Sequence, residues 1–147
     1  MPRDFLPENV VSFPSAYIFN KDTSSQGGSH WLLLVFQNNE TAYLFDSFGY
    51  KPQFYNLEDV LEGYNCIYNE IRLQSKNSNV CGYFCIYVAY MLAYNVPFND
   101  IINGFDVDYI VNDYTVVEYI STFDILCSSY KKCGDWNQTC KCMNYNG

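Results

Sequence analysis

A cysteine stands at the point where a polar loop gives way to an apolar helix. Residues 77–95, NSNVCGYFCIYVAYMLAYN, open polar, reach Cys81-Gly82 and then continue apolar for about three helical turns. A helix N-terminus offers unpaired N–H groups and the positive end of the helix dipole, and both stabilise a thiolate. Cys81 is therefore a candidate nucleophile, and the alternative is a buried core thiol.

The chain has a single histidine, His30, which follows a Gly-Gly loop and begins an apolar strand. Asp46 closes the next predicted strand, 16 residues later. An even separation brings the two side chains opposite each other only if the hairpin loop has an odd number of residues or a bulge intervenes. With that geometry His30 is the candidate general base and Asp46 the carboxylate that orients it. The alternative for Asp46 is a cap of the DSFG turn.

Two further residues near Cys81 complete a candidate site. Gln74 precedes Cys81 by seven residues, in the loop that enters the helix. Its side-chain NH₂ could face a developing oxyanion beside the Cys81 backbone N–H, and the alternative is a solvated loop residue. Gly82 would let a substrate backbone approach closely. The set predicts acyl transfer through a thioester, with no metal and no cofactor.

The segments that must position these residues predict an α+β fold. The fold class is a small, mostly antiparallel sheet packed by helices, with Cys81 at the N-terminus of a buried helix. A hairpin around Asn38-Asn39 is expected, because asparagine tolerates positive φ. The first hairpin strand is apolar throughout, so we expect burial on both of its faces. Strands are predicted over 16–19, 30–37, 41–47 and 65–73, and helices over 57–64, 81–94 and 114–130.

Composition limits the classes of function. With 147 residues, 49% hydrophobic and 19% aromatic, the chain predicts one packed domain over residues 1–147. The net charge of −8 disfavours direct binding to nucleic acid. No apolar run is long enough to span a membrane, and no signal peptide is apparent. The expected setting is the reducing cell interior, where seven cysteines mean free thiols, a metal site or a nucleophile.

The other cysteines have simpler explanations. Cys85 lies on the same helix face as Cys81 and is expected in the core. Four cysteines near the C-terminus could hold Zn²⁺, but their C-x₅-C-x₆-C-x-C spacing fits no common finger, and spare thiols are the favoured interpretation. These four are Cys127, Cys133, Cys140 and Cys142.

In chain order, the segments GGSHW, YLFDSFG and LQSKNSNVCGYFC resemble the adenovirus maturation protease family (adenain). They also resemble the wider group of viral and SUMO-specific cysteine proteases of the same fold. The resemblance extends from about Gly27 to Tyr94, nearly half the chain. Each motif alone is weak, but their order on the predicted strands, loop and helix is specific. The matching residues are His30-Trp31, Asp46, Gln74 and Cys81-Gly82.

The resemblance implies a cysteine endopeptidase that cleaves viral precursor proteins during virion maturation, in the virion and the host cell interior. It implies cleavage at glycine-containing sites, which suit a narrow tunnel beside the cysteine. Trp31 matches the residue that commonly forms this tunnel, and with Gly82 it would bind substrate. The catalytic residues implied are His30, Asp46, Gln74 and Cys81.

Two properties of adenain are not assigned to this chain on the resemblance alone. Adenain is basic and uses DNA as a cofactor, whereas this chain is acidic, so the DNA role is not carried over. Adenain is also stimulated by a short peptide that is disulfide-linked to a cysteine upstream of the glutamine. Cys66 occupies a comparable place with a shorter spacing to Gln74, and an activating peptide at Cys66 is an open alternative.

Two other functions compete. A deconjugating protease for a ubiquitin-like modifier would use the same catalytic set, but it needs a broad surface for a folded partner, which the small chain disfavours. A catalytically inactive binding module predicts loss of a catalytic residue, and none is lost here.

Overall fold

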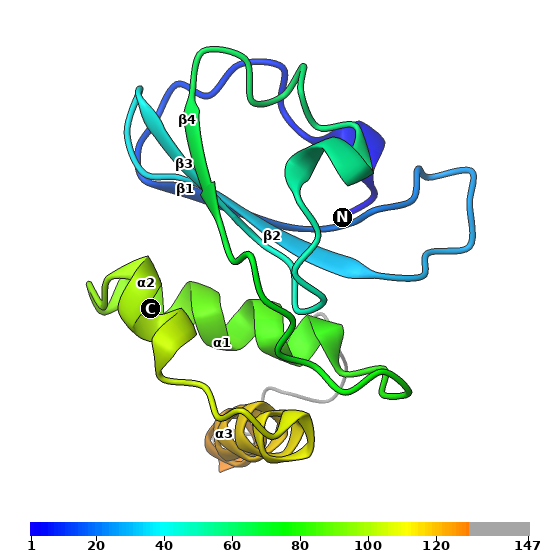
Figure 1. Ribbon diagram of the computed structural model, residues 1–147, viewed down its shortest axis with the longest axis vertical. Coiled ribbons are helices and arrows are strands. Elements are labelled where there is room, and N and C mark those ends of the chain that lie inside the picture. The colour runs from blue at the N-terminus through cyan, green and yellow to red at the C-terminus, as the bar shows by residue number, and fades with distance from the viewer. Residues whose placement is uncertain (130–147) are drawn as a thin grey trace.

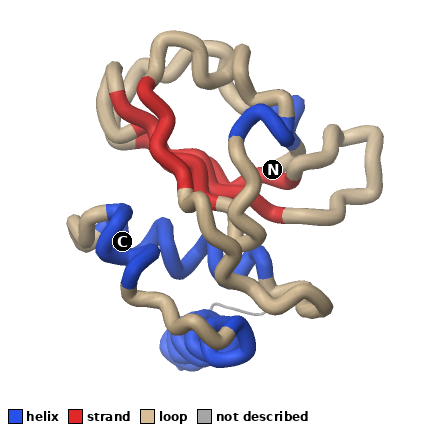
Figure 2. Tube along the Cα trace, viewed as in Figure 1, coloured by secondary structure: helices blue, strands red, loops and turns tan. Residues whose placement is uncertain are grey.

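Four strands form one sheet in the order β1-β2-β3-β4 (Figures 1 and 2). The computed structural model describes residues 1–129, with side chains to Phe123. β1 pairs antiparallel with β2 and β2 with β3, whereas β4 runs parallel to β3. The prediction of a mostly antiparallel sheet in an α+β fold is confirmed. The strands are β1 (Ser15–Asn20), β2 (Trp31–Phe36), β3 (Thr41–Phe45) and β4 (Asn65–Tyr68).

Helices cover one face of the sheet, and α1 lies between the sheet and α3 (Figure 1). Turns and short 3₁₀ segments cover the other face. Among residues 1–129, no helix combines the length and apolar character needed to cross a bilayer. The helical elements are η1 (Arg3–Phe5), η2 (Pro52–Tyr55), α1 (Cys81–Ala93), α2 (Phe98–Asn103) and α3 (Tyr109–Ser129).

β2 is the strand that joins two hydrophobic cores. Because successive side chains of a strand point to opposite faces, Leu33 and Val35 pack toward the helices, while Leu32 and Leu34 pack toward the turns. Every residue of β2 after Trp31 is buried, as its continuous apolar sequence predicts. The strand that begins beside His30 is therefore held firmly from both sides.

The β2–β3 hairpin sets the spacing of His30 and Asp46. The Gln37 N–H donates to the Thr41 carbonyl at 2.9 Å, which leaves a three-residue loop at 38–40. The hairpin loop therefore has an odd number of residues, as the spacing of His30 and Asp46 requires. The ladder ends with Leu33 opposite Phe45, so His30 and Asp46 lie diagonally across the strand ends rather than directly opposite. Diagonal neighbours share one face of the sheet and remain within reach of long side chains.

Three predicted elements differ from the structure. Residues 57–64 form turns rather than a helix, because a single helical turn ends at Gly63 with φ +85°. The strand predicted over 65–73 ends at Tyr68. The last helix begins at Tyr109 rather than 114, since the Asp108 carboxylate accepts the Ile110 N–H at 2.9 Å and caps it. The six-residue α2 was not predicted. Cys133, Cys140 and Cys142 lie outside the described residues, as does the side chain of Cys127.

Gly49 closes the turn that follows β3. Its φ is +77°, and its N–H donates to the Asp46 carbonyl at 2.8 Å. A Cβ at this position would lie 2.5 Å from the backbone carbonyl carbon of Ile71, far inside contact distance. Glycine is thus required both by the backbone conformation and by the close approach of the chain before Gln74.

We expect Gly49→Ala to lower the free energy of unfolding by clearly more than Gly63→Ala. Both glycines have positive φ, and that strain alone costs roughly 1–2 kcal/mol. Only Gly49 adds a backbone collision, because nothing lies within 4 Å of a Cβ at Gly63. Urea denaturation of both variants measures the difference. Equal losses would show that the approach to Ile71 does not constrain the turn.

Candidate active site

Cys81 is the first residue of α1, and its sulfur meets the start of β2. The residue before it, Val80, provides no side-chain cap, so the first N–H groups of the helix remain free of the usual Ser, Thr, Asp or Asn acceptor. The Cys81 sulfur accepts the Trp31 N–H at 3.5 Å. Cys81 is 7% exposed. The helix start predicted from the sequence therefore carries a thiol surrounded by N–H donors.

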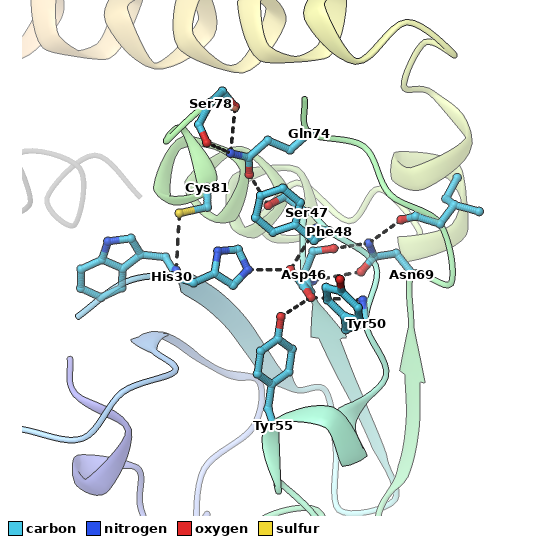
Figure 3. Close-up of polar contacts among 12 residues, drawn as sticks. His30, Asp46, Ser47, Phe48, Tyr50, Tyr55, Asn69, Gln74, Ser78 and Cys81 are labelled. Atoms are coloured by element: carbon cyan, nitrogen blue, oxygen red, sulfur yellow. Dashed lines mark hydrogen bonds and ion pairs between the residues drawn. The ribbon is translucent and has the colours of Figure 1, made fainter. Parts of the chain in front are cut away.

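The His30 imidazole lies between Cys81 and Asp46 (Figure 3). Its Nε2 is 2.7 Å from the Asp46 Oδ1, which leaves Nδ1 as the other ring nitrogen. The ring of Phe48 packs on the imidazole with a centroid distance of 4.9 Å. His30 is 7% exposed and Asp46 is 1% exposed, so the hydrogen bond between them is shielded from water. The structure brings together the three residues that the sequence selected.

The Asp46 carboxylate is saturated with donors. Besides His30, its Oδ1 accepts the Phe48 N–H at 2.9 Å, and its Oδ2 accepts the Tyr50 N–H at 3.1 Å and the Tyr55 hydroxyl at 2.5 Å. A carboxylate held by this many donors has one orientation available, and it therefore fixes the imidazole.

Asn69 fixes the backbone of Asp46, and neither Asn69 nor Tyr55 was identified from the sequence. The Asn69 side chain accepts the Asp46 N–H at 3.0 Å and donates to the Asp46 carbonyl (Figure 3). It is 2% exposed and follows the last residue of β4. Asn69 fell inside the strand predicted over 65–73, and no sequence pattern pointed to Tyr55 in its 3₁₀ segment.

The electrostatics favour a charged Cys81–His30 pair. Burial alone would lower the pKa of His30, but the hydrogen bond to Asp46 and the interaction with Cys81 outweigh burial and raise this pKa to about 9. Burial would raise the pKa of Cys81, but interaction with His30 and the backbone N–H groups of Trp31 and Gly82 lower it. The two shifts together stabilise a thiolate beside an imidazolium.

In the other described cysteines, the pKa of the thiol is raised rather than lowered. Burial raises the pKa of Cys66 to about 11. Burial also raises the pKa of Cys85 well above its ordinary value, as expected for a core thiol. Within residues 1–123, Cys81 is thus the cysteine with a stabilised thiolate.

Gln74 is fully buried, with its amide held at both ends (Figure 3). Its Oε1 accepts the Ser47 hydroxyl at 2.5 Å. Its Nε2 donates to the carbonyl and to the hydroxyl of Ser78, each at 2.9 Å. Gln74 is therefore not a solvated loop residue. Neither contact was predicted from the sequence.

Trp31 and Gly82 lie against each other next to Cys81. A Cβ added to Gly82 would lie 3.4 Å from the Trp31 ring, so the indole lies directly beside this glycine. Trp31 is 37% exposed. The indole thus lies beside the first turn of α1, next to the Cys81 thiol.

The chain is also similar to known proteins. The adenovirus endoprotease family model matches residues 4–130. A protease of bovine adenovirus 2 is 34% identical over 87 residues, which are 48% of this chain and 42% of that protein. The chain thus matches less than half the length of this relative.

Two solved structures are remotely similar. The ASFV protease has 17% identity and a TM-score of 0.45, over 69% of this chain and 42% of that one. ChlaDub1 from Chlamydia trachomatis has 19% identity and a TM-score of 0.47, over 65% of this chain and 47% of that one. The family model, in contrast, covers most of the chain and includes all the residues of the site described above. The chain belongs to the adenovirus endoprotease family.

Proposed function

We propose that this chain is a viral cysteine endopeptidase with Cys81 as nucleophile, His30 as acid and base, and Asp46 as the orienting carboxylate. The observation that carries the proposal is the lowered pKa of Cys81 at an uncapped helix start, beside a histidine bound by a buried carboxylate. Membership of the adenovirus endoprotease family supports the same chemistry. A core thiol would have a raised pKa, as Cys85 does.

The proposed reaction is acyl transfer in two halves. The Cys81 thiolate attacks the scissile carbonyl carbon, a C–S bond forms, and the carbonyl oxygen becomes an oxyanion. When this intermediate collapses, the C–N bond breaks and the His30 imidazolium gives its proton to the leaving amine. The neutral imidazole then takes a proton from water, which attacks the thioester and releases the peptide acid. Cys81 leaves as thiolate, and His30 is again protonated.

The Gln74 amide and the Cys81 backbone N–H are the proposed oxyanion donors. Both Nε2 hydrogens of Gln74 are directed at Ser78. One of them must turn toward the oxyanion during the reaction. The Ser78 hydroxyl is the partner more easily released, because it also donates to the Ser75 carbonyl at 3.2 Å. A buried donor that is already desolvated can stabilise the oxyanion strongly.

The proposed substrates are protein segments with glycine at the cleavage site. The Trp31 indole beside Gly82 narrows the approach to Cys81, and a large substrate side chain would meet the ring. Family membership supports viral precursor proteins as substrates during virion maturation, within the virion and the host cell. The net charge of −8 speaks against DNA as a partner. A disulfide-linked activating peptide at Cys66 gains little support, because burial raises the pKa of that thiol to about 11.

Cleavage of glycine-rich peptides should depend on Cys81 alone among the described cysteines. We expect wild type and Cys66→Ala to cleave a reduced peptide panel, and Cys81→Ala to lose all measurable cleavage because no nucleophile remains. Mass spectrometry of the products measures this. Residual cleavage by Cys81→Ala would contradict the assignment. Cleavage confined to a folded ubiquitin-like fusion would favour a deconjugating protease.

The pH profile of kcat/KM should be bell-shaped. The rate falls at low pH, where the Cys81 thiolate is protonated, and at high pH, where His30 loses its proton near pH 9. Asp46→Asn removes the carboxylate that raises the His30 pKa, so burial dominates and the alkaline limb moves to lower pH. Asp59→Asn makes the same change of charge at an exposed position and should leave the profile in place. An alkaline limb that Asp46→Asn does not move would contradict the role of Asp46.

A further inference from the structure

Ser47 lies in the turn after β3 and makes hydrogen bonds beyond those of the turn itself. It is fully buried, and its hydroxyl donates to the Gln74 Oε1 at 2.5 Å. Its carbonyl accepts two N–H groups of the same segment, from Leu73 at 2.8 Å and from Gln74 at 3.1 Å. Three hydrogen bonds therefore connect this one residue to the segment that carries the buried amide.

The hydrogen-bond roles in this network are fixed by chemistry. An amide oxygen only accepts and a backbone carbonyl only accepts, so the Ser78 carbonyl must face the Nε2 of Gln74. The Ser47 hydroxyl must then donate to Oε1. When the Gln74 Nε2 turns from Ser78 toward an oxyanion, its hydrogen bonds to Ser78 weaken. These are the bonds that orient the nitrogen end of the amide. The Ser47 contact at the oxygen end remains.

We propose that Ser47 is a positioning residue that holds the Gln74 amide by its oxygen while the nitrogen turns between Ser78 and the oxyanion. The inference rests on the proposed function and deepens it. Ser47 also directly follows Asp46, so one peptide unit carries the groups that orient His30 and Gln74. Displacement of this unit would disturb the base and the oxyanion donor together.

The test compares Ser47→Ala with Gln74→Ala in peptide cleavage and in alkylation of Cys81 by iodoacetamide. Loss of the Gln74 donor should lower kcat by roughly 10²–10³. Loss of the Ser47 hydroxyl removes one hydrogen bond that supports it, and kcat should fall about tenfold with KM little changed. Alkylation needs a thiolate but no oxyanion, so its rate and pH dependence should be those of wild type. Ser75→Ala is the matched control on the same loop, because its hydroxyl contacts Asp113 rather than Gln74.

A second measurement reports on the position of the Gln74 side-chain amide and does not depend on peptide cleavage. With ¹⁵N-glutamine labelling, the Gln74 NH₂ protons are assigned by their absence in Gln74→Ala. They should exchange slowly with water in wild type and Ser75→Ala, and faster in Ser47→Ala.

Three results would overturn the inference: an unchanged kcat in Ser47→Ala while Gln74→Ala is impaired, an equal loss of cleavage and alkylation, or unchanged exchange of the Gln74 amide. A wild type that cleaves no peptide would instead overturn the proposed function, and the exchange rates would still decide the position of the amide.

Discussion

The candidate active site depends on one buried hydrogen bond, between His30 Nε2 and the Asp46 carboxylate. A histidine this deeply buried would ordinarily lose its proton, because desolvation disfavours the charged form. The hydrogen bond to the carboxylate, together with the interaction with Cys81, reverses that preference and raises the pKa of His30 to about 9. Burial raises the pKa of Cys81, but the resulting positive charge lowers it, together with the backbone N–H groups of Trp31 and Gly82. Asp46 thus contributes to the Cys81 thiolate indirectly, through His30.

The fold supplies the rigidity that this bond needs. β2 is packed by hydrophobic cores on both faces, so His30 at its start cannot move far. The three-residue hairpin loop sets the diagonal register of the strand ends. Asn69 and Tyr55 hold the backbone and the carboxylate of Asp46 from two further segments. α1 brings Cys81 to the strand ends that carry His30 and Asp46, because the side chains of α1 pack on the face of the sheet that the helices cover.

The sequence predicted the candidate catalytic residues because chemistry restricts residue type: the chain has a single histidine, and one cysteine stands at a helix start. It also predicted β2 and α1, where continuous apolar runs leave little choice. It failed over 57–64, where a helix was predicted but a positive φ at Gly63 stops the first turn. The contacts of Ser47, Asn69 and Tyr55 were beyond prediction, because they join segments that become neighbours only after folding.

The most direct test of this account is an NMR titration of the His30 imidazole. The chain has a single histidine, so the ring resonances need no assignment strategy. The account predicts that the ring titrates near pH 9, with a lower value in Cys81→Ala, where the thiolate that helps to hold the charge is missing. A midpoint near the ordinary histidine value of about 6.5, unaffected by Cys81→Ala, would contradict the charged pair and with it the central claim.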